Sequence, residues 1–363
     1  MSDAWMIYGA NGYTGELAAR EAVRQGMSPV LAGRNPEAVN ALARELGLMG
    51  RAFPLDDRGR VVAVLSELQI KAVLHCAGPF VLTSAPMVEA CLEAGAHYLD
   101  ITGEIAVFEA VFARAEAARR AGVALLPGVG FDVVPSDCLA ARLGSALPGA
   151  VELTLAFASD RGSFSRGTLK TMIEGLPNAG AVRRNGRIVP VPVAFDAREI
   201  EFSCGRRMAM TIPWGDVSTA YHSTGIPNIR VYTGTPPKAV RRARRLAPLL
   251  PLAGWRPVKR FLQGWVDRRV TGPSEEMRAT ARVYLWGEAR RGEEAVTATL
   301  ETPEAYAFTA VSAVASVARV LEGGVQPGAW TPSRAFGERF VDGLPGVVAG
   351  EIRRTGPPLG SAS

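Results

Sequence analysis

Three glycines break the chain near its start, between an apolar run and a helix-like pattern. Residues 5–8 are typical of a buried strand, and from Glu16 onward apolar residues recur at helical spacing. Gly9, Gly12 and Gly15 therefore lie at a strand-to-helix turn, where free N–H groups and the helix dipole favour a phosphate. They permit, in order, a tight turn, close approach of a pyrophosphate, and contact between helix and strand. A tight turn without a ligand is the alternative interpretation.

The end of the next apolar strand distinguishes between two dinucleotides. Residues 28–35 end in Gly33, Arg34 and Asn35, with no carboxylate to accept bonds from the hydroxyls of a ribose, as NAD enzymes require. An arginine fork suits a ribose phosphate, and the asparagine adds a donor. The sequence thus predicts NADP(H) rather than NAD(H), with a solvated surface arginine as the alternative.

The order of strands and helices predicts an α/β chain with two domains. Strand and helix patterns alternate at first, as in a Rossmann-type, doubly wound parallel sheet. From about residue 150, longer alternating stretches predict a second α+β domain with a mixed, mostly antiparallel sheet. We expect an NADP-binding domain at 1–135, a substrate and catalytic domain at 136–304, and a C-terminal helical segment at 305–363 that packs back on the first domain.

Ligands of an open parallel sheet bind beyond the carboxyl ends of its strands. This places the catalytic candidates Glu104 and Asp132, from HYLDITGE and GFDVVPSD, at the same edge as Phe80, which we expect to cover the nicotinamide ring. Asp100 could line the same cleft, with the capping of a turn as the alternative. Ser136 is the expected N-cap of the next helix, and Asp137 is expected to interact with the dipole of that helix. Further cofactor-binding candidates at these strand ends are Asp56, Cys76, Ala77, Gly78, Pro79 and Thr102.

A reduction that uses the hydride of NADPH also needs a proton donor. The chain has no tyrosine-lysine pair at helical spacing. Lys170, in GTLKTMIE on an expected helix of the second domain, is the third catalytic candidate, with a solvated lysine as the alternative. Tyr98, Tyr221 and His222 are further candidates, with a structural or surface role as the alternative for His222.

Composition excludes several classes of protein. The chain of 363 residues is 48% hydrophobic and carries a net charge of +6, without a basic stripe interleaved with aromatic residues in the first domain, so nucleic acid is not an expected partner. Its 4 cysteines form no C-x-x-C pair, which indicates neither a disulfide framework nor a metal site. We expect a cytoplasmic protein, since the glycine turn starts too early for a signal peptide and no apolar stretch is long enough to span a bilayer.

One later segment is both basic and apolar. In residues 236–270, Val258, Phe261, Leu262, Trp265 and Val266 predict one apolar helical stripe, with arginines mostly off it. Such a pattern suits peripheral contact with a membrane or a cover over an acyl substrate. The alternative is an ordinary helix packed on its own domain or across a homodimer.

The motifs together resemble a known family. The run YGANGYTGELAA, then LAGRN, CAGPF, HYLDITGE and GFDVVPSD, and later GPSEE, AYAFTA and GAWTPSRAFGE, is similar to the saccharopine dehydrogenase-like oxidoreductases. More narrowly, it resembles the branch with trans-acting enoyl reductases of lipid and polyketide assembly. The resemblance covers nearly the whole chain and is looser from about residue 160 to 270. It implies a Rossmann domain, a second α/β domain and NADPH, with family cofactor motifs matched at Gly9, Asn11, Gly12, Tyr13, Thr14, Arg34 and Gly78.

We therefore expect an NADPH-dependent reductase of an activated C=C bond in an acyl or polyketide-type substrate. An enolate calls for hydrogen-bond donors, whereas an iminium favours carboxylates such as Glu104 or Asp132. A saccharopine-type imine or carbonyl reductase is thus one alternative. An NADP(H)-binding regulatory protein that senses redox state is another.

Overall fold

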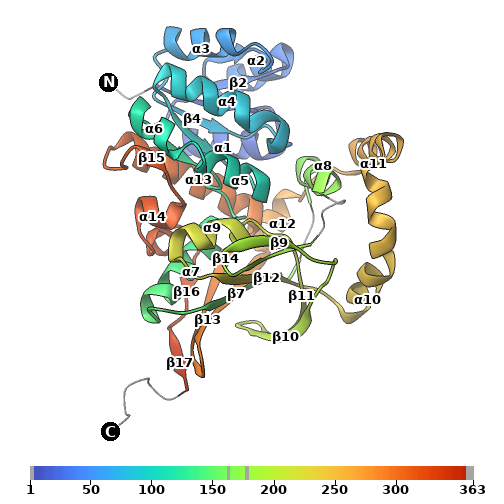
Figure 1. Ribbon diagram of the computed structural model, residues 1–363. Coiled ribbons are helices and arrows are strands. Elements are labelled where there is room, and N and C mark those ends of the chain that lie inside the picture. The colour runs from blue at the N-terminus through green and yellow to red at the C-terminus, as the bar shows by residue number, and fades with distance from the viewer. Residues whose placement is uncertain (1–3, 162–163, 176–179, 357–363) are drawn as a thin grey trace.

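The computed structural model describes residues 4–161, 164–175 and 180–356, which contain two β-sheets (Figure 1). The first sheet is parallel throughout and has the strand order β15-β6-β5-β4-β1-β2-β3. Apart from β15, this is the order of a Rossmann fold, with the switch point between β1 and β4. Its strands are β1 (Trp5–Tyr8), β2 (Val30–Gly33), β3 (Gly50–Ala52), β4 (Ala72–His75), β5 (His97–Asp100), β6 (Ala124–Leu126) and β15 (Gly328–Ala329).

Helices cover both faces of this sheet because alternate residues of each strand point to opposite sides. Met6 and Tyr8 pack with α3, α4, α5 and α6, whereas Trp5 and Ile7 pack with α1, α2 and α13. The predicted doubly wound sheet is confirmed. The helices are α1 (Tyr13–Arg24), α2 (Pro36–Leu46), α3 (Arg58–Glu67), α4 (Phe80–Ala94), α5 (Ile105–Phe112), α6 (Ala115–Ala121) and α13 (Ala305–Leu321).

The second sheet is mixed, as predicted. Its order is β10-β11-β12-β7-β13-β14-β16; β12 and β7 run parallel and the other pairs antiparallel. β17 pairs with β14, and the hairpin β8-β9 pairs with β12. The strands are β7 (Glu152–Ser159), β8 (Ala181–Arg184), β9 (Arg187–Pro190), β10 (Ala197–Phe202), β11 (Gly205–Thr211), β12 (Asn228–Gly234), β13 (Arg282–Arg291), β14 (Glu294–Pro303), β16 (Val348–Ala349) and β17 (Arg353–Thr355).

Helices α7 (Val134–Ala146) and α9 (Asp216–Thr224) cover one face of the second sheet and share its main core. We expected Ser136 to be the N-cap of α7, and this prediction was wrong. The helix begins at Val134, with Pro135 in its first turn, where no N–H is needed, and the Ser136 hydroxyl donates to the Val133 carbonyl oxygen. The Asp137 carboxylate accepts from the Ser333 N–H (2.7 Å), and so ties α7 to the C-terminal part of the chain.

The chain returns to the first domain after β14. Helix α13 packs on α1, and β15 pairs with β6. The short helices α14 (Pro332–Phe336) and η3 (Phe340–Gly343) then lead to β16 and β17, which pair with β14 of the second sheet. The residues after 304 are thus divided between the two domains.

Three helices lie to one side of the body (Figure 1). Helix α8 (Arg166–Gly175) packs on α11 (Arg256–Arg269), which follows α10 (Pro237–Leu246) and the 3₁₀ segment η2 (Ala247–Gly254). The short helix α12 (Glu275–Thr280) then leads into β13. Within the described ranges, no helix combines the length and apolar character that crossing a bilayer requires.

Candidate active site

The glycine turn between β1 and α1 leaves no room for side chains. Gly9 has a φ of 84°, and a Cβ there would lie 2.8 Å from the Ala77 nitrogen. A Cβ on Gly15 would overlap the Gly9 carbonyl oxygen. No side chain caps α1, which starts after Gly12, so its first N–H groups are available to a ligand. The turn therefore fits the pyrophosphate of a dinucleotide.

The end of β2 offers a cation without a carboxylate partner. Arg34 is exposed and makes no ion pair with any described residue. Asn35 caps α2, since its Oδ1 accepts from the N–H groups of Glu37 (3.0 Å) and Ala38 (3.2 Å), which leaves only its amide NH₂ to donate. A guanidinium free of carboxylates at this position suits a ribose phosphate.

Asn11 and Asp56, two other predicted cofactor-binding residues, lie at the same corner. A Cβ on Gly33 would lie 2.7 Å from the Asn11 Oδ1, so the glycine turn and the end of β2 touch. Burial raises the pKa of Tyr8 to about 12, while Arg34 lowers it and Asp56 raises it. The charges of Arg34 and Asp56 therefore lie close enough to act on the same hydroxyl.

Glu104 has a structural task that its sequence position did not indicate. Its carboxylate accepts from the Phe80 N–H (2.8 Å) and the Val81 N–H (3.0 Å), and so caps the start of α4. Burial raises the pKa of Glu104, and these two N–H groups counteract it. The cap holds the turn of residues 76–79 beside Gly9. We therefore assign Glu104 to positioning this turn, because its oxygens already serve the helix.

The loop after β5 is organised by Asp100. Its carboxylate accepts from the N–H groups of Thr102 (3.0 Å) and Gly128 (2.8 Å), and burial raises its pKa to about 6. The Thr102 side chain is fully buried and accepts from the Glu104 N–H (3.1 Å). Thr102 therefore shapes the loop and, contrary to our expectation, presents no surface to a cofactor.

Asp132, a predicted catalytic residue, lies just beyond β6 and is half-buried. Burial raises the pKa of its carboxyl group to about 7. That group makes no hydrogen bond to a described residue, and a Cβ on Gly103 would overlap its Oδ2. It thus lies against the loop that follows β5, and close to physiological pH it exists in both protonation states.

A second carboxyl group lies near the first. Asp216 at the start of α9 is fully buried, and burial raises its pKa well above the usual range. Asp132 and Asp137 raise it further, while a hydrogen bond with Ser136 lowers it. Its Oδ2 has no hydrogen-bond partner among the described residues. Burial therefore favours the protonated form of the Asp216 carboxyl group.

Segments of the second domain close over the glycine turn. The Tyr13 hydroxyl donates to the Pro273 carbonyl oxygen (2.7 Å), and its ring meets the Tyr306 ring edge-on, with centroids 5.1 Å apart. The Tyr306 hydroxyl accepts from the Ser165 N–H (2.7 Å) and shares a hydrogen bond with the Thr168 hydroxyl (2.7 Å). The residues that precede α8 and α12 are thereby tied to the predicted cofactor site.

Helix α8 also lies close to the predicted nicotinamide side. A Cβ on Gly78 would be 3.7 Å from the Thr171 hydroxyl, and Lys170 is the preceding residue of the same helix. Glu174 accepts from the Lys259 ammonium (2.5 Å) and the Gln263 amide (2.8 Å), which fixes α8 to α11. Lys170 is half-buried and has interactions of its own, so the structure places it near this edge without giving it a role.

Other candidates have structural roles. Tyr98 is fully buried, donates to Asp100 (2.7 Å) and has a pKa raised well above its usual value by burial. His222 stacks on Phe112 with centroids 4.0 Å apart, and Tyr221 lies under the Arg183 guanidinium. Phe80 is buried and packs edge-on against His75, and its role as a cover for the nicotinamide stays a prediction.

The site also contains residues that the sequence did not single out. Tyr306 occurs in a matched motif, and the capping residue Glu304 marks the start of its helix, but neither shows that its hydroxyl meets Ser165. Asp216 lies in the run PWGD, which is not part of any of the motifs named above. The described residues include no group of three or more His, Cys, Asp or Glu arranged to hold a metal ion.

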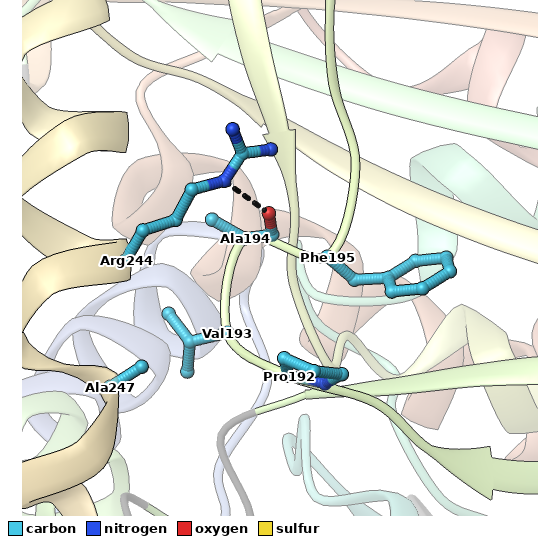
Figure 2. A pocket seen from close by; sticks show the side chains of 6 residues that line it. All are labelled: Pro192, Val193, Ala194, Phe195, Arg244 and Ala247. Atoms are coloured by element: carbon cyan, nitrogen blue, oxygen red, sulfur yellow. Dashed lines mark hydrogen bonds between the residues drawn. The ribbon is translucent and has the colours of Figure 1, made fainter.

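A hollow of about 270 Å³ lies elsewhere, between α10 and the residues before β10 (Figure 2). Its lining is largely apolar. The Arg244 Nε donates to the Ala194 carbonyl oxygen (3.0 Å) across it, so its one charged side chain already has a partner. The hollow contains no candidate for catalysis.

Comparisons with known proteins agree with this geometry. Residues 5–126 match the saccharopine dehydrogenase NADP binding domain. The chain is 30% identical over 214 residues to a saccharopine dehydrogenase-like oxidoreductase of Rattus norvegicus, covering 52% of this chain and 50% of that one. It is 33% identical over 185 residues to a protein of Mycobacterium tuberculosis provisionally named a trans-acting enoyl reductase, covering 48% and 44%.

Two solved structures share the fold. Saccharopine dehydrogenase (L-Glu forming) of Saccharomyces cerevisiae has a TM-score of 0.64 at 12% identity, with 98% of this chain and 100% of that one covered. Homospermidine synthase of Legionella pneumophila, in complex with NAD, has a TM-score of 0.62 at 11% identity, with 98% and 91% covered. The chain spans about half the length of the curated relatives it matches.

Fold and site together define a Rossmann domain that has NADP as its cofactor. The chain is similar to the saccharopine dehydrogenase-like oxidoreductases over about half of its length, and its first domain matches their NADP binding domain. The resemblance stated from the motifs and the expected cofactor are thus confirmed.

Proposed function

We propose that the protein reduces an activated C=C bond of an acyl or polyketide-type substrate with NADPH. NADPH, when bound, supplies the hydride, which adds to the β-carbon of an enoyl thioester. The electron pair of the C=C bond then forms an enolate, and the α-carbon takes up a proton. The chain must hold the cofactor, exclude water and deliver this proton.

The half-buried carboxyl group of Asp132 carries the proposal. Its pKa of about 7 lets it give up a proton to an enolate and regain one at neutral pH. It lies beyond β6, on the β4-β5-β6 side of the switch point, where a Rossmann fold places the nicotinamide half. The carboxyl group of Asp216 nearby, whose pKa burial raises, adds a second group that can carry a proton.

Exposed apolar side chains near the Gly78 turn favour an acyl chain over an amino acid. Val81 and Leu82, in the first turn of α4, are 49% and 66% exposed. Met172, which follows Thr171 on α8, is 49% exposed. Such side chains favour contact with a hydrocarbon chain rather than with a charged amino acid.

The same two carboxyl groups also favour a different substrate, an imine. In its ionised state, the Asp132 carboxylate, with Asp216 nearby, suits the cation of an imine better than the anion of an enolate. A saccharopine-type imine or carbonyl reductase is therefore the second candidate. The relatives' names include both kinds of activity.

The experiment is NADPH oxidation by the purified protein with two panels of substrates. One contains 2-enoyl thioesters of increasing chain length, and the other pairs 2-oxo acids with amino acids. Turnover of long enoyl thioesters that Asp132→Asn abolishes supports the proposal. Turnover only in the second panel supports the imine reductase, and tight NADPH binding without oxidation in either panel supports a redox sensor.

A further inference from the structure

The residues from α10 to α11 form an arm that carries large apolar side chains on its surface. We define the arm as residues 237–269. Its outer side chains are well exposed: Leu246 42%, Leu249 55%, Leu252 58%, Trp255 66%, Phe261 72% and Trp265 53%. Isolated exposed apolar residues are ordinary, but six within one segment of this length indicate a binding surface.

Helix α11 has two different faces. Lys259 and Gln263 bind Glu174 of α8, and Val266 is buried. Phe261 and Trp265, four residues apart, lie on the opposite side of the helix from these contacts. The single apolar stripe expected from the sequence is therefore divided into an inner, packed edge and an outer, exposed edge.

The arm carries a larger excess of positive charge than the chain as a whole. It contains ten lysines and arginines and one aspartate, whereas the whole chain has a net charge of only +6. None of its nine basic residues other than Lys259 makes an ion pair with any residue that the structure describes. These cations therefore remain available to an anionic partner.

The arm is fixed in place at both ends. The Arg244 guanidinium donates to the Ala194 carbonyl oxygen near its base (Figure 2), and Lys259 and Gln263 bind Glu174 toward its far end. The arm stands to one side of the body (Figure 1). Its outer residues are thus held outward, and a broad, flat partner can reach them.

We propose that the outer surface of the arm binds the headgroup region of an anionic phospholipid membrane. Tryptophan and phenylalanine beside arginines suit this interface, where rings enter the headgroup layer and cations meet phosphates. An acidic carrier protein would satisfy the same charges. It would leave the protruding Trp255, Phe261 and Trp265 without an apolar environment, so the membrane explains more of the surface.

Vesicle sedimentation tests the proposal without measuring catalysis. The probes are phosphatidylcholine vesicles with and without about one third phosphatidylserine. Wild-type protein should sediment with the anionic vesicles at low salt and be released at about 0.5 M salt, where screening shortens the range of charge attraction. Brominated acyl chains in the same vesicles should quench tryptophan emission, which needs no substitution.

Two pairs of variants identify the surface. Phe261→Ser with Trp265→Ser, and separately Arg260→Glu with Arg268→Glu, should each weaken binding about tenfold or more. The matched controls are Met49→Ser with Val348→Ser, which are exposed apolar residues elsewhere, and Arg339→Glu with Arg353→Glu, which are exposed arginines without ion pairs to described residues. Both controls should bind as wild type, and circular dichroism should show that all variants fold.

Failure of wild-type protein to sediment with anionic vesicles at low salt, or unquenched tryptophan emission, overturns the proposal. So does equal binding by the arm variants and their controls. A lipid-free dimer that Phe261→Ser with Trp265→Ser converts to a monomer would instead make the surface an interface between two copies. Binding to an acidic carrier protein but not to vesicles would assign it to that partner.

Discussion

The carboxyl group of Asp132 lies against the backbone of Gly103, so closely that a Cβ on residue 103 would overlap Oδ2. This contact joins the ends of β5 and β6 at the edge of the sheet where the nicotinamide half of a dinucleotide binds. It also removes water from one side of the carboxyl group, in keeping with the raised pKa. The contact therefore both places and tunes the proposed proton donor.

Asp132→Asn should reduce kcat about 100-fold or more, because the amide cannot donate the proton. For the wild type, the rate should fall as pH rises through about 7, where the carboxyl group loses its proton. For the variant, this step in the pH profile should be absent. A variant that keeps both its rate and the wild-type profile would exclude Asp132 as the donor.

Asp132→Asn should increase the free energy of unfolding, although it lowers kcat. Asp132 has a higher pKa in the folded chain than its ordinary value of about 4, so its contribution to the free energy of unfolding falls as pH rises from about 4 to about 7. Asp132→Asn removes this loss. Denaturant unfolding should therefore show the variant gaining stability relative to wild type across this interval, and a constant difference would contradict the raised pKa.

Gly103→Ala should displace Asp132 and lower kcat while NADPH affinity stays within about threefold, because the cofactor turn lies elsewhere. The measurements are steady-state kinetics and cofactor titration. Gly343→Ala is the matched control, since a Cβ there meets no atom within 4 Å. Equal kcat values for the two variants would show that the contact with Gly103 is not needed.

Arg34→Ala should raise the KM for NADPH about 10- to 100-fold and leave the KM for NADH nearly unchanged, since only NADPH carries the ribose phosphate. Arg44→Ala is the control, an exposed arginine on the next helix without an ion pair among the described residues. An equal effect on both cofactors would contradict the role of Arg34.

Glu104→Ala should lower the free energy of unfolding by about 1 to 2 kcal/mol, because the N–H groups of Phe80 and Val81 lose their acceptor. Glu104→Gln keeps one acceptor oxygen and should retain most of the stability and of kcat. A loss of kcat in Glu104→Gln as large as that in Asp132→Asn would restore Glu104 as a catalytic residue.

The first domain could be predicted from sequence because its signals are local. Gly9, Gly12 and Gly15 mark the turn, and apolar runs such as residues 72–75 mark buried strands. Residues 106–122 have the sequence pattern of one long helix, but they form two helices, α5 and α6, with no glycine or proline at the break between them. Nothing in the structure explains this break.

The site was predicted less completely because its contacts join distant parts of the chain. Asp132 was found because it follows a strand, whereas Tyr306 meets Ser165 across 141 residues. Glu104 follows a strand in the same way, yet its carboxylate caps a helix. Position at a strand end selects residues near the cofactor, but only the fold distinguishes a free carboxyl group from a cap.

Deuterium tracing tests the proposed function most directly. The protein is given a 2-enoyl thioester with NADPH deuterated at C4, in the R and the S position in turn, and the product is analysed by mass spectrometry and NMR. We predict that one of the two forms places deuterium on the β-carbon of a saturated acyl thioester, and that reaction in D₂O with ordinary NADPH places it on the α-carbon. Deuterium transfer to a carbon bound to nitrogen in a 2-oxo acid and amine mixture, with none to any enoyl thioester, would contradict the account.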